Sequence, residues 1–375
     1  MINGSGSLRL ISGVGTKGPA CFLVEVGGKR LMLDLGEGPP PELLPNVDGV
    51  GAIDALVLSH GHKDHVGGLS LLPKLGNPPI YATAIVARGL PKGIAARPLP
   101  VGGRGEVLGI AVQTGRNGHA PGGIWLRLAI GDGLLYTGDF STESILYAYD
   151  PPPPPYPPPL AGEGRVGAGT VLMDCSYGSY DKPIAECWNK LAAFIERGPL
   201  FLPVPANGRG PEIALELMRH GFDDIFVDDA MQNALRRLAE SDGISLRAGI
   251  GDEIRHLAEK VKPIVDARGV MLATSADGTS GATARLLTQW EHAAEPAIVF
   301  TGYVAPGTPA DRLIKSGRAQ FMRWNVHPRL SDTVALVRAV QAKTVIPAFC
   351  DRSQLAGLAA AFTRARVTMD GPVEL

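Results

Sequence analysis

The sequence of 375 residues has no apolar run that approaches the roughly 20 residues of a membrane-spanning helix. Its start lacks the basic stretch and apolar core of a signal peptide. Cysteines are few: Cys21, Cys175, Cys187 and Cys350 are scattered and form no C-x-x-C pair. These absences argue against a membrane protein and a disulfide scaffold, and we expect a cytoplasmic protein in a reducing compartment.

The sequence also lacks a charge excess, because 36 Lys and Arg face 37 Asp and Glu, for a net charge of −1. A protein that coats nucleic acid without specificity is usually far more basic. A nuclease with a local basic cleft stays compatible with this balance. The chain is long enough for two compact domains, and its 48 Gly and 32 Pro favour a loop-rich α/β architecture over a helical bundle.

Short strands separated by turns dominate the first third of the chain. The apolar segments 21–26 and 30–35 flank a Gly-Gly turn and predict a β-hairpin. Residues 53–60 are almost continuously apolar, as in a buried strand, and 124–130 with 134–140 predict a second hairpin. Polar side chains that follow these strands would lie on loops held by a rigid sheet, where catalytic groups are common.

The pattern changes near residue 178. From there helices alternate with short apolar strands, for example the helical stretch 185–198, the strand 200–205 and a helix within 207–221. This alternation predicts a parallel β/α region, unlike the hairpins before it. The last stretch, 326–375, is expected to return to short strands.

A proline-rich stretch, 150–164, interrupts the first pattern. Proline runs cannot continue a helix or a central strand and favour extended polyproline II. We interpret this stretch as a stiff surface loop. Its proline-dense part, 150–159, is also a candidate contact for a partner with an aromatic groove.

The densest set of ligand-type residues follows the apolar segment 53–60. The sequence SHGHKDHVGG places His60 and His62 two positions apart and then Asp64 beside His65. In an extended loop, positions i and i+2 point the same way, so the first two histidines can bind one metal ion. The adjacent acid and histidine can turn toward a second position. Imidazoles with a carboxylate suit Zn²⁺, with Mn²⁺ or Fe as alternatives.

A two-metal site needs more ligands than these four, and three further residues are candidates. His119 lies between glycine-rich turns before a strand, and Asp139 directly follows one. They could supply a third histidine to the first metal and a carboxylate that bridges both ions. Asp34, in LMLDLGEG, could orient a ligand histidine, although a turn aspartate at a strand end would look the same.

The order and spacing of these residues resemble the metal motifs of the metallo-β-lactamase superfamily, with Asp34 at the first motif. The segment YTGDFS (136–141) more specifically resembles the β-CASP branch, which includes the cleavage-and-polyadenylation endonuclease, ribonuclease J and Artemis. The resemblance implies an α/β fold: a metallo-β-lactamase αββα sandwich built from 1–177 and 326–375, with an inserted β-CASP-like α/β cap domain at 178–325.

Later segments resemble the β-CASP branch too. LMDCSYGS (172–179) places Asp174 at the acid of motif A, and RWNVHPRLSD (323–332) places His327 at motif B. The resemblance therefore covers nearly the whole chain. Two more segments that resemble stretches of that branch are PANGRGPEIALEL (205–217) and FTGYVAPGTPADRL (300–313).

This resemblance implies nuclease chemistry, in which a metal-activated water in a cleft between two domains attacks a phosphodiester of RNA or DNA. It also implies catalytic roles for Asp64, Asp174 and His327, since a His–Asp pair beside cations can protonate the leaving oxygen. Arg209, at a helix start, could hold a phosphate or could be an exposed loop arginine. The implied ligands of two Zn²⁺ or Mn²⁺ ions are His60, His62, Asp64, His65, His119 and Asp139.

One position departs from the family pattern. Motif C is a histidine in a stretch like I-P-V-H-G-E, whereas VIPAFCD (345–351) has Phe349 there. Phenylalanine cannot bind a metal ion, so three outcomes stay open: a weak second metal, a single-metal enzyme, or replacement by Cys350 or Asp351. A free cysteine is more often a small buried residue than a ligand.

Two other functions compete with the nuclease. The same fold hosts many chemistries, so a hydrolase of a small ester, thioester or phosphodiester is the alternative. A partner-binding protein without activity is the third, weakened because every ligand other than the motif C histidine is present. The sequence leaves open whether the role is RNA processing or DNA repair, which metal is native, and whether identical copies associate.

Overall fold

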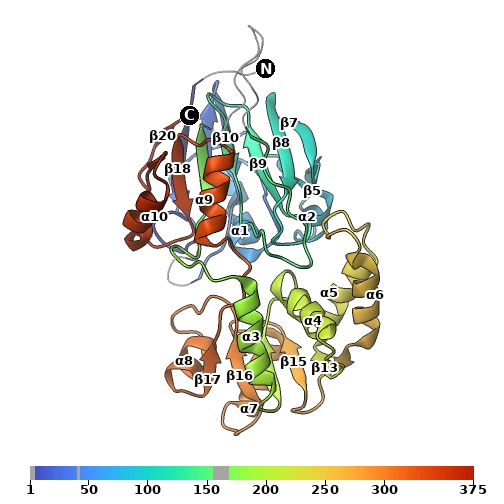
Figure 1. Ribbon diagram of the computed structural model, residues 1–375. Helices are drawn as coiled ribbons and strands as arrows, with labels where there is room; N and C mark the ends of the chain where they lie inside the picture. The colour runs from blue at the N-terminus through green and yellow to red at the C-terminus, as the bar shows by residue number, and fades with distance from the viewer. Residues whose placement is uncertain (1–4, 40–42, 155–168) are drawn as a thin grey trace. The chain divides into compact units, whose positions relative to one another are not determined.

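The computed structural model describes residues 5–39, 43–154 and 169–375 (Figure 1). Their contacts divide the chain into two compact units. None of the helices described is both long and apolar enough to cross a membrane. The first unit comprises Met1–Thr142, Tyr149–Asp181 and His327–Leu375, and the second comprises Glu143–Ala148 and Lys182–Val326.

Two seven-stranded sheets, counted over the described residues, form the frame of the first unit. Their strand orders are β20-β1-β2-β3-β4-β5-β6 and β19-β18-β11-β10-β9-β8-β7. The first sheet contains β1 (Gly6–Ser12), β2 (Cys21–Val26), β3 (Lys29–Leu33), β4 (Ala55–Val57), β5 (Ile80–Thr83), β6 (Ala96–Leu99) and β20 (Val373–Glu374). The second contains β7 (Gly103–Val107), β8 (Ile110–Arg116), β9 (Ile124–Leu128), β10 (Leu134–Tyr136), β11 (Thr170–Asp174), β18 (Thr344–Ala348) and β19 (Arg366–Val367).

The two sheets pack face to face because apolar side chains alternate along their strands. In β2, Phe22 and Val24 belong to the core that also holds Leu126 and Tyr136 of the second sheet. Leu23, between them, belongs to the core on the opposite face. This period of two is what a strand buried on both faces produces.

Helices cover the outer face of each sheet. The apolar residues of η1 (Gly67–Leu75) and α2 (Ala84–Arg88) pack on the first sheet. Those of α9 (Leu330–Ala339) and α10 (Leu355–Ala361) pack on the second. This helix–sheet–sheet–helix arrangement confirms the predicted αββα sandwich. Two single-turn helices complete the unit: α1 (Lys63–Val66) and η2 (Arg352–Gln354).

The expectation of short strands alone at 326–375 was wrong for α9 and α10. In α9 the buried residues include Leu336 and Val337, which form only a short apolar stripe. Its first turn is closed by the Arg329 backbone N–H, which donates to the Asp332 carboxylate (3.0 Å). Arginine is not one of the residues that usually mark a helix start, so the letters at this position do not indicate a helix.

A parallel sheet forms the centre of the second unit, as the alternation of helices and strands predicted. Its six described strands follow the order β14-β13-β15-β12-β16-β17. Helices α3 to α6 pack on one face, and α7 and α8 on the other. The strands are β12 (Leu200–Pro203), β13 (Ile225–Val227), β14 (Lys262–Pro263), β15 (Val270–Ala273), β16 (Ala297–Phe300) and β17 (Ala319–Phe321). The helices are α3 (Ile184–Ile195), α4 (Arg209–Arg219), α5 (Asp229–Ala239), α6 (Ile250–Lys260), α7 (Gly281–Trp290) and α8 (Pro309–Lys315).

A short segment, Glu143–Ala148, belongs to the second unit although the chain on both sides of it belongs to the first. The Glu143 carboxylate accepts a hydrogen bond from the Asn325 side chain (2.9 Å), and the Ile145 N–H donates to Glu212 (2.8 Å). The boundaries predicted from the sequence did not include this excursion, and they remain a proposal about separately folding domains.

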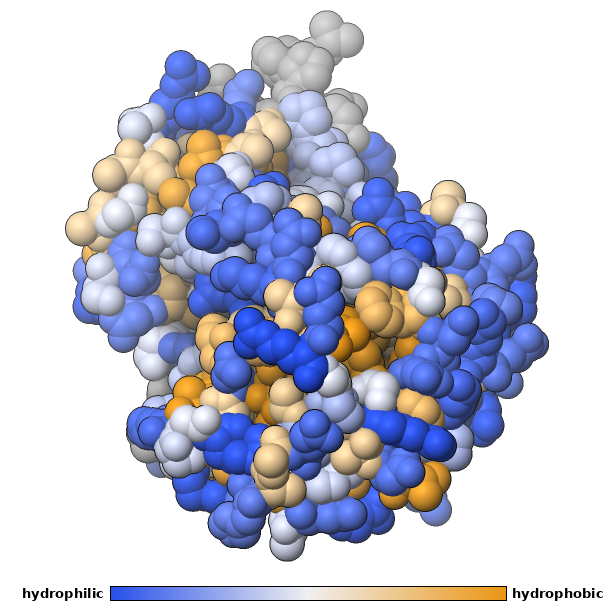
Figure 2. Space-filling model, turned by 60° about the horizontal axis from the view of Figure 1, so that its bottom comes forward, coloured by the Kyte–Doolittle hydropathy of each residue, from blue (hydrophilic) through white to orange (hydrophobic). Residues whose placement is uncertain are grey.

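Both hairpins predicted from the sequence are present, since β2 pairs antiparallel with β3, and β9 with β10. The proline-rich stretch 150–164 lies mostly outside the described residues, and with it the predicted partner contact at 150–159. On the face shown in Figure 2, hydrophilic residues predominate and apolar areas are interspersed among them. Scattered apolar residues of this kind are ordinary at a protein surface.

Candidate metal centre

Strand ends of both sheets deliver ligand-type side chains to one place in the first unit. His60 follows β4 of the first sheet. From the second sheet, His119 lies between β8 and β9, Asp139 follows β10, and Asp174 ends β11. Loops and strand ends carry these residues, while the strands below them fix their positions. The structure thus brings together candidates that are more than 100 positions apart in the sequence.

His60, His62, His119 and Asp139 are called the three-histidine cluster below, since their ligand atoms lie within 4.8 Å of one another. His62 Nδ1 is 3.2 Å from His60 Nε2 and 3.0 Å from His119 Nε2. Asp139 Oδ2 lies 3.6 Å from His119 Nε2 and 3.9 Å from His60 Nε2. Imidazole nitrogens and a carboxylate oxygen that converge in this way form a donor set that suits Zn²⁺.

The electrostatics of this cluster also fit a cation. Burial lowers the pKa of His60 well below its usual value, and the neighbouring imidazoles lower it further. The pKa of His62 falls to about 4, through burial first and the nearby His119 second. Both rings are therefore neutral at neutral pH. A neutral imidazole keeps the lone pair that a metal ion needs.

Asp64, His65 and Asp139 form a second group, called the Asp64 cluster below, whose ligand atoms also lie within 4.8 Å of one another. Asp139 belongs to both clusters. His65 Nε2 is buried 3.3 Å from Asp139 Oδ1 and makes no hydrogen bond among the described residues. A buried polar atom without a partner is rare in native proteins, and a bound cation would provide one.

Asp34 holds the His65 ring in place. Its Oδ2 is 2.7 Å from His65 Nδ1 and accepts a hydrogen bond from the Tyr136 hydroxyl (2.5 Å). Ser59 donates both its backbone N–H (2.7 Å) and its hydroxyl (2.6 Å) to the same carboxylate. With Nδ1 bonded to Asp34, the Nε2 atom faces the Asp64 cluster.

The same contacts govern the charge of His65. Burial by itself would lower the pKa of this ring, but Asp139 and Asp34 raise it well above its usual value. A cation that binds Nε2 must therefore displace a proton. Of the two roles considered for Asp34, the structure favours the carboxylate that orients a histidine over the turn residue.

His327 and Asp174 form a pair beside the three-histidine cluster. His327 Nδ1 is 2.8 Å from Asp174 Oδ2 and 3.7 Å from Asp139 Oδ2. Burial would raise the pKa of Asp174, but the charge of His327 and hydrogen bonds from His327 and Ser176 lower it to about 2. The His327 side chain is 12% exposed, against 0% for Asp174, so its ring is the accessible member of the pair.

Two glycines allow the chain to pass close to the centre. A Cβ on Gly36 would lie 1.7 Å from the Asp64 carbonyl oxygen. Gly138 precedes Asp139 and has φ +53°, and a Cβ there would lie 2.7 Å from the Ser59 hydroxyl. Neither position accepts a side chain unless a residue of the centre moves.

Arg209 belongs to the second unit, at the first residue of α4. It is buried, so the interpretation as an exposed loop arginine was wrong. Its guanidinium lies against the backbone of Gly302, where a Cβ would be 2.3 Å from the Arg209 Nη2 atom. The role as a phosphate-binding residue stays a prediction.

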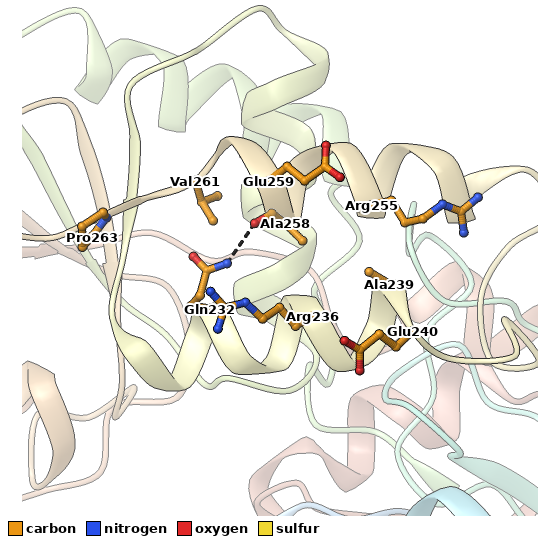
Figure 3. A pocket seen from close by; sticks show the side chains of 9 residues that line it. All are labelled: Gln232, Arg236, Ala239, Glu240, Arg255, Ala258, Glu259, Val261 and Pro263. Atoms are coloured by element: carbon orange, nitrogen blue, oxygen red, sulfur yellow. Dashed lines mark hydrogen bonds between the residues drawn. The ribbon is translucent and has the colours of Figure 1, made fainter.

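A separate surface groove lies between α5 and α6 of the second unit (Figure 3). Its volume is about 500 Å³, and the Gln232 side chain, which lines it, donates a hydrogen bond to the Ala258 carbonyl (2.8 Å). No residue that the sequence predicted for the site appears among the described residues that line it. The groove and the metal centre are thus distinct features.

Comparisons with known proteins agree with this geometry. Residues 14–182 match the model of the metallo-beta-lactamase superfamily. The chain is 26% identical over 344 residues to "Ribonuclease TTHA0252" of Thermus thermophilus, and the alignment covers 77% of each protein. It is also 26% identical over 257 residues to "Transcription termination factor FttA" of Cenarchaeum symbiosum, which covers 56% of this chain and only 38% of that factor.

The chain belongs to the metallo-β-lactamase superfamily. Within the superfamily it falls in the β-CASP-like nuclease branch. The fold has a counterpart in "Crystal Structure of a Protein of Unknown Function from Enterococcus faecalis V583", with a TM-score of 0.59, 14% identity and 99% of both chains covered. In a metallo-β-lactamase fold, the two clusters described above form a site for a divalent metal ion.

The superfamily motifs led to the ligand candidates but not to the residues that hold them. Ser59 and Tyr136 donate to Asp34, and neither was expected from the sequence. Asn117 is fully buried, and its side-chain oxygen accepts the His119 N–H (3.0 Å). Ser59 and Asn117 lie one and two positions from a candidate histidine, yet short polar residues there look like ordinary turn residues.

Phe349, where the superfamily resemblance places a histidine, is buried, and its ring centroid lies 5.1 Å from that of His65. Cys350 is buried as well, and burial raises the pKa of its thiol to about 12. Asp351 is exposed and accepts the Ser353 N–H (2.8 Å). Neither of these two residues belongs to a ligand cluster in the described part of the chain.

Proposed function

We propose that this protein is a metal-dependent phosphodiester hydrolase, a nuclease that cleaves RNA or DNA. The observation that carries the proposal is the position of the Asp174–His327 pair, with His327 Nδ1 3.7 Å from Asp139, the carboxylate that both clusters share. Hydrolysis of a phosphodiester needs a nucleophile, neutralisation of charge and a proton for the leaving oxygen. The clusters and the accessible His327 ring offer these three together.

In this proposal the three-histidine cluster holds one cation, and the Asp64 cluster is the position for a second, with Asp64 as a ligand and catalytic carboxylate. Zn²⁺ suits the donor set best, and Mn²⁺ is the alternative. When bound, such cations supply an activated water and neutralise charge on the phosphoryl oxygens.

His327 acts as the proton donor to the leaving oxygen. Its Nδ1 is paired with Asp174, which leaves Nε2 to carry the transferred proton. Asp174 is itself held by the Ser176 backbone N–H (2.9 Å), so the orientation of the ring is fixed. Because the pKa of Asp174 lies near 2, its carboxylate stays ionised and stabilises the charged imidazole.

The printed names of the relatives support nucleic acid as the substrate. One is a ribonuclease and another a transcription termination factor, which favours RNA processing over DNA repair. Identity to both is 26%, so the exact substrate is part of the proposal. A cytoplasmic location also belongs to it, supported by the four cysteines, which are free, buried thiols.

The test is a cleavage assay with end-labelled single-stranded RNA and DNA in the presence of Zn²⁺ or Mn²⁺. We expect cleavage of at least one polymer by the parent and none by His62→Ala or Asp64→Ala. His292→Ala is the matched control, because the His292 side chain is 91% exposed and outside both clusters. Cleavage that survives in both ligand variants would refute the proposal, as would the absence of cleavage of either polymer.

A small ester, thioester or phosphodiester is the second candidate substrate. The buried Phe349 ring beside His65 favours it, because this ring gives the centre an apolar wall. Chromogenic esters and bis(p-nitrophenyl) phosphate in the same assay separate the candidates. Turnover of these compounds alone, lost in the same two ligand variants, would support the small-molecule hydrolase.

A further inference from the structure

The two clusters of the metal centre are unequal. The three-histidine cluster has four members, whereas the described residues supply only three to the Asp64 cluster. A cation held by three protein groups, one of them shared with a neighbouring cation, depends strongly on what occupies its fourth side. The residues on that side therefore decide whether the Asp64 cluster holds a metal ion.

Phe349 closes one side of the Asp64 cluster. Its ring lies edge-on to His65, with 5.1 Å between centroids, and also edge-on to Phe22 at 6.1 Å. The residue is 4% exposed and has φ +60°, a conformation that is uncommon for a bulky side chain. An aromatic hydrocarbon ring offers no lone pair to a metal ion, and in this packed position it excludes a water that could serve as a ligand instead.

The loop that joins β1 to β2 approaches the same place and is fastened on both sides. Its Ala20 N–H donates to the Asp64 carbonyl (2.9 Å), and its Gly13 carbonyl accepts the Phe349 N–H (2.7 Å). Lys17 lies between these two anchor points along the chain. The backbone thus places a lysine between Asp64 and the segment that contains Phe349.

The ammonium of Lys17 acts on residues of both these segments. Burial raises the pKa of Asp64, but nearby cationic groups, His65 first and Lys17 among them, lower it overall. Lys17 also opposes the effect of burial on the Cys350 thiol, the residue after Phe349. A positive charge on a flexible stem is therefore within electrostatic reach of the Asp64 carboxylate.

We propose that Lys17 supplies, beside Asp64, the positive charge that a second divalent cation would otherwise bring, so that the protein holds one cation tightly, at the three-histidine cluster. Phe349 removes a ligand from the second position, and the ammonium of Lys17 repels a cation that approaches it. The inference rests on the proposed function only in taking the two clusters as a metal centre.

The experiment is a metal titration of the apoprotein with Zn²⁺, read as stoichiometry by native mass spectrometry and as affinity by calorimetry. The parent should bind one Zn²⁺ tightly and a second weakly. In Phe349→His the second dissociation constant should fall at least about tenfold, since even an indirect partner of a metal ligand changes affinity by that factor. Histidine is more common than phenylalanine at positive φ, so the variant is expected to fold.

Two further variants complete the test. Phe349→Leu is the matched control, because it removes the ring without adding a ligand, and it should still bind one Zn²⁺ tightly. Lys17→Met changes a half-buried side chain outside the core and should tighten the second site about fivefold through loss of repulsion, in the parent and in Phe349→His alike.

The outcomes separate this inference from the proposed function. Two Zn²⁺ ions bound with similar affinity by the parent would overturn the inference and leave the nuclease proposal intact. A second site that neither Phe349→His nor Lys17→Met strengthens would overturn it as well. A parent that binds no Zn²⁺ would overturn the metal centre itself.

Discussion

At the scale of single residues, Asp34 is the strongest example of a side chain that acts through another. It is fully buried and accepts hydrogen bonds from Ser59 and Tyr136 while it orients His65. In Asp34→Asn, the amide group cannot accept all these hydrogen bonds and places a donor toward hydroxyl groups. Metal affinity should fall about 10- to 100-fold, measured by competition with a chromogenic chelator.

Asp48→Asn serves as the control for this change, because the Asp48 side chain is 74% exposed and pairs only with Lys74 among the interactions described. Its metal affinity should equal that of the parent. An Asp34→Asn protein that binds metal as tightly as the parent would show that Asp34 is a turn residue without influence on the centre.

His327 allows a second prediction at this scale. His327→Ala should lower turnover by about 10²- to 10⁴-fold, the range for loss of one general acid. Metal content, measured by elemental analysis, should stay that of the parent, because His327 is a proton donor in the proposed mechanism and not a ligand. Loss of metal together with activity would instead assign the ring to the group that it forms with Asp139 and Asp174.

The sequence revealed the ligand candidates of this site because their chemistry is visible in the letters. Histidines two positions apart, followed at once by an acid and a third histidine, are typical of metal binding when they share so short a segment. The sequence did not reveal Ser59, Tyr136 or Lys17, since a serine, a tyrosine or a lysine gains its role only from what folding places beside it. Asp34 stood between these cases, and its burial beside His65 decided it.

At the scale of elements, the loops of the centre depend on close backbone contact. Gly36 is the tightest case, because a Cβ there would lie 1.7 Å from the Asp64 carbonyl oxygen, a backbone atom that cannot turn away. Gly36→Ala should therefore displace the α1 segment. We expect a loss of folding free energy of at least about 1–3 kcal/mol and loss of bound metal.

Gly61→Ala is the matched control for that prediction. Gly61 lies within the same metal motif, yet a Cβ there would meet nothing within 4 Å in the described structure. Urea unfolding and metal analysis of both variants check the prediction. Equal behaviour of the two variants would mean that the loop around Gly36 adapts freely and that close packing does not position Asp64.

The elements that could be predicted were those with a strong local signal. The hairpins β2–β3 and β9–β10 follow from alternating apolar residues and glycine turns, and the parallel sheet of the second unit follows from its alternation with helices. Helices α9 and α10 were missed because their apolar stripes are short. The excursion of Glu143–Ala148 was invisible, since it depends on hydrogen bonds to residues as distant as Glu212 and Asn325.

At the scale of the whole molecule, Glu212 couples the stability of the second unit to pH. Burial raises the pKa of this carboxyl from 4.5 to about 7, against the opposing hydrogen bonds of Ile145 and Ser144. A carboxyl that holds its proton more tightly in the folded protein stabilises it fully below pH 4.5. This contribution, on the order of 3 kcal/mol, is lost as the pH rises from 4.5 to about 7.

Glu212→Gln isolates that effect, because glutamine still accepts the Ile145 N–H but does not ionise. Variant and parent should be equally stable near pH 4.5, and the variant more stable above pH 7 by on the order of 3 kcal/mol, measured by urea unfolding across this range. Glu240→Gln, an exposed change on α5, is the control. A stability difference between Glu212→Gln and the parent that does not vary with pH would contradict the prediction.

The division of the chain into two units predicts how metal and pH act on the whole protein. A cation that binds only the folded first unit stabilises it by about 2.7 kcal/mol when the free metal is 100 times its dissociation constant. Chelation should therefore lower the unfolding temperature of the first unit, where both clusters lie, and leave that of the second unchanged. Glu212→Gln should shift the second transition alone. Calorimetry of the two proteins with and without Zn²⁺ tests this, and a metal-dependent shift of the transition that responds to Glu212→Gln would show that the two units unfold as one.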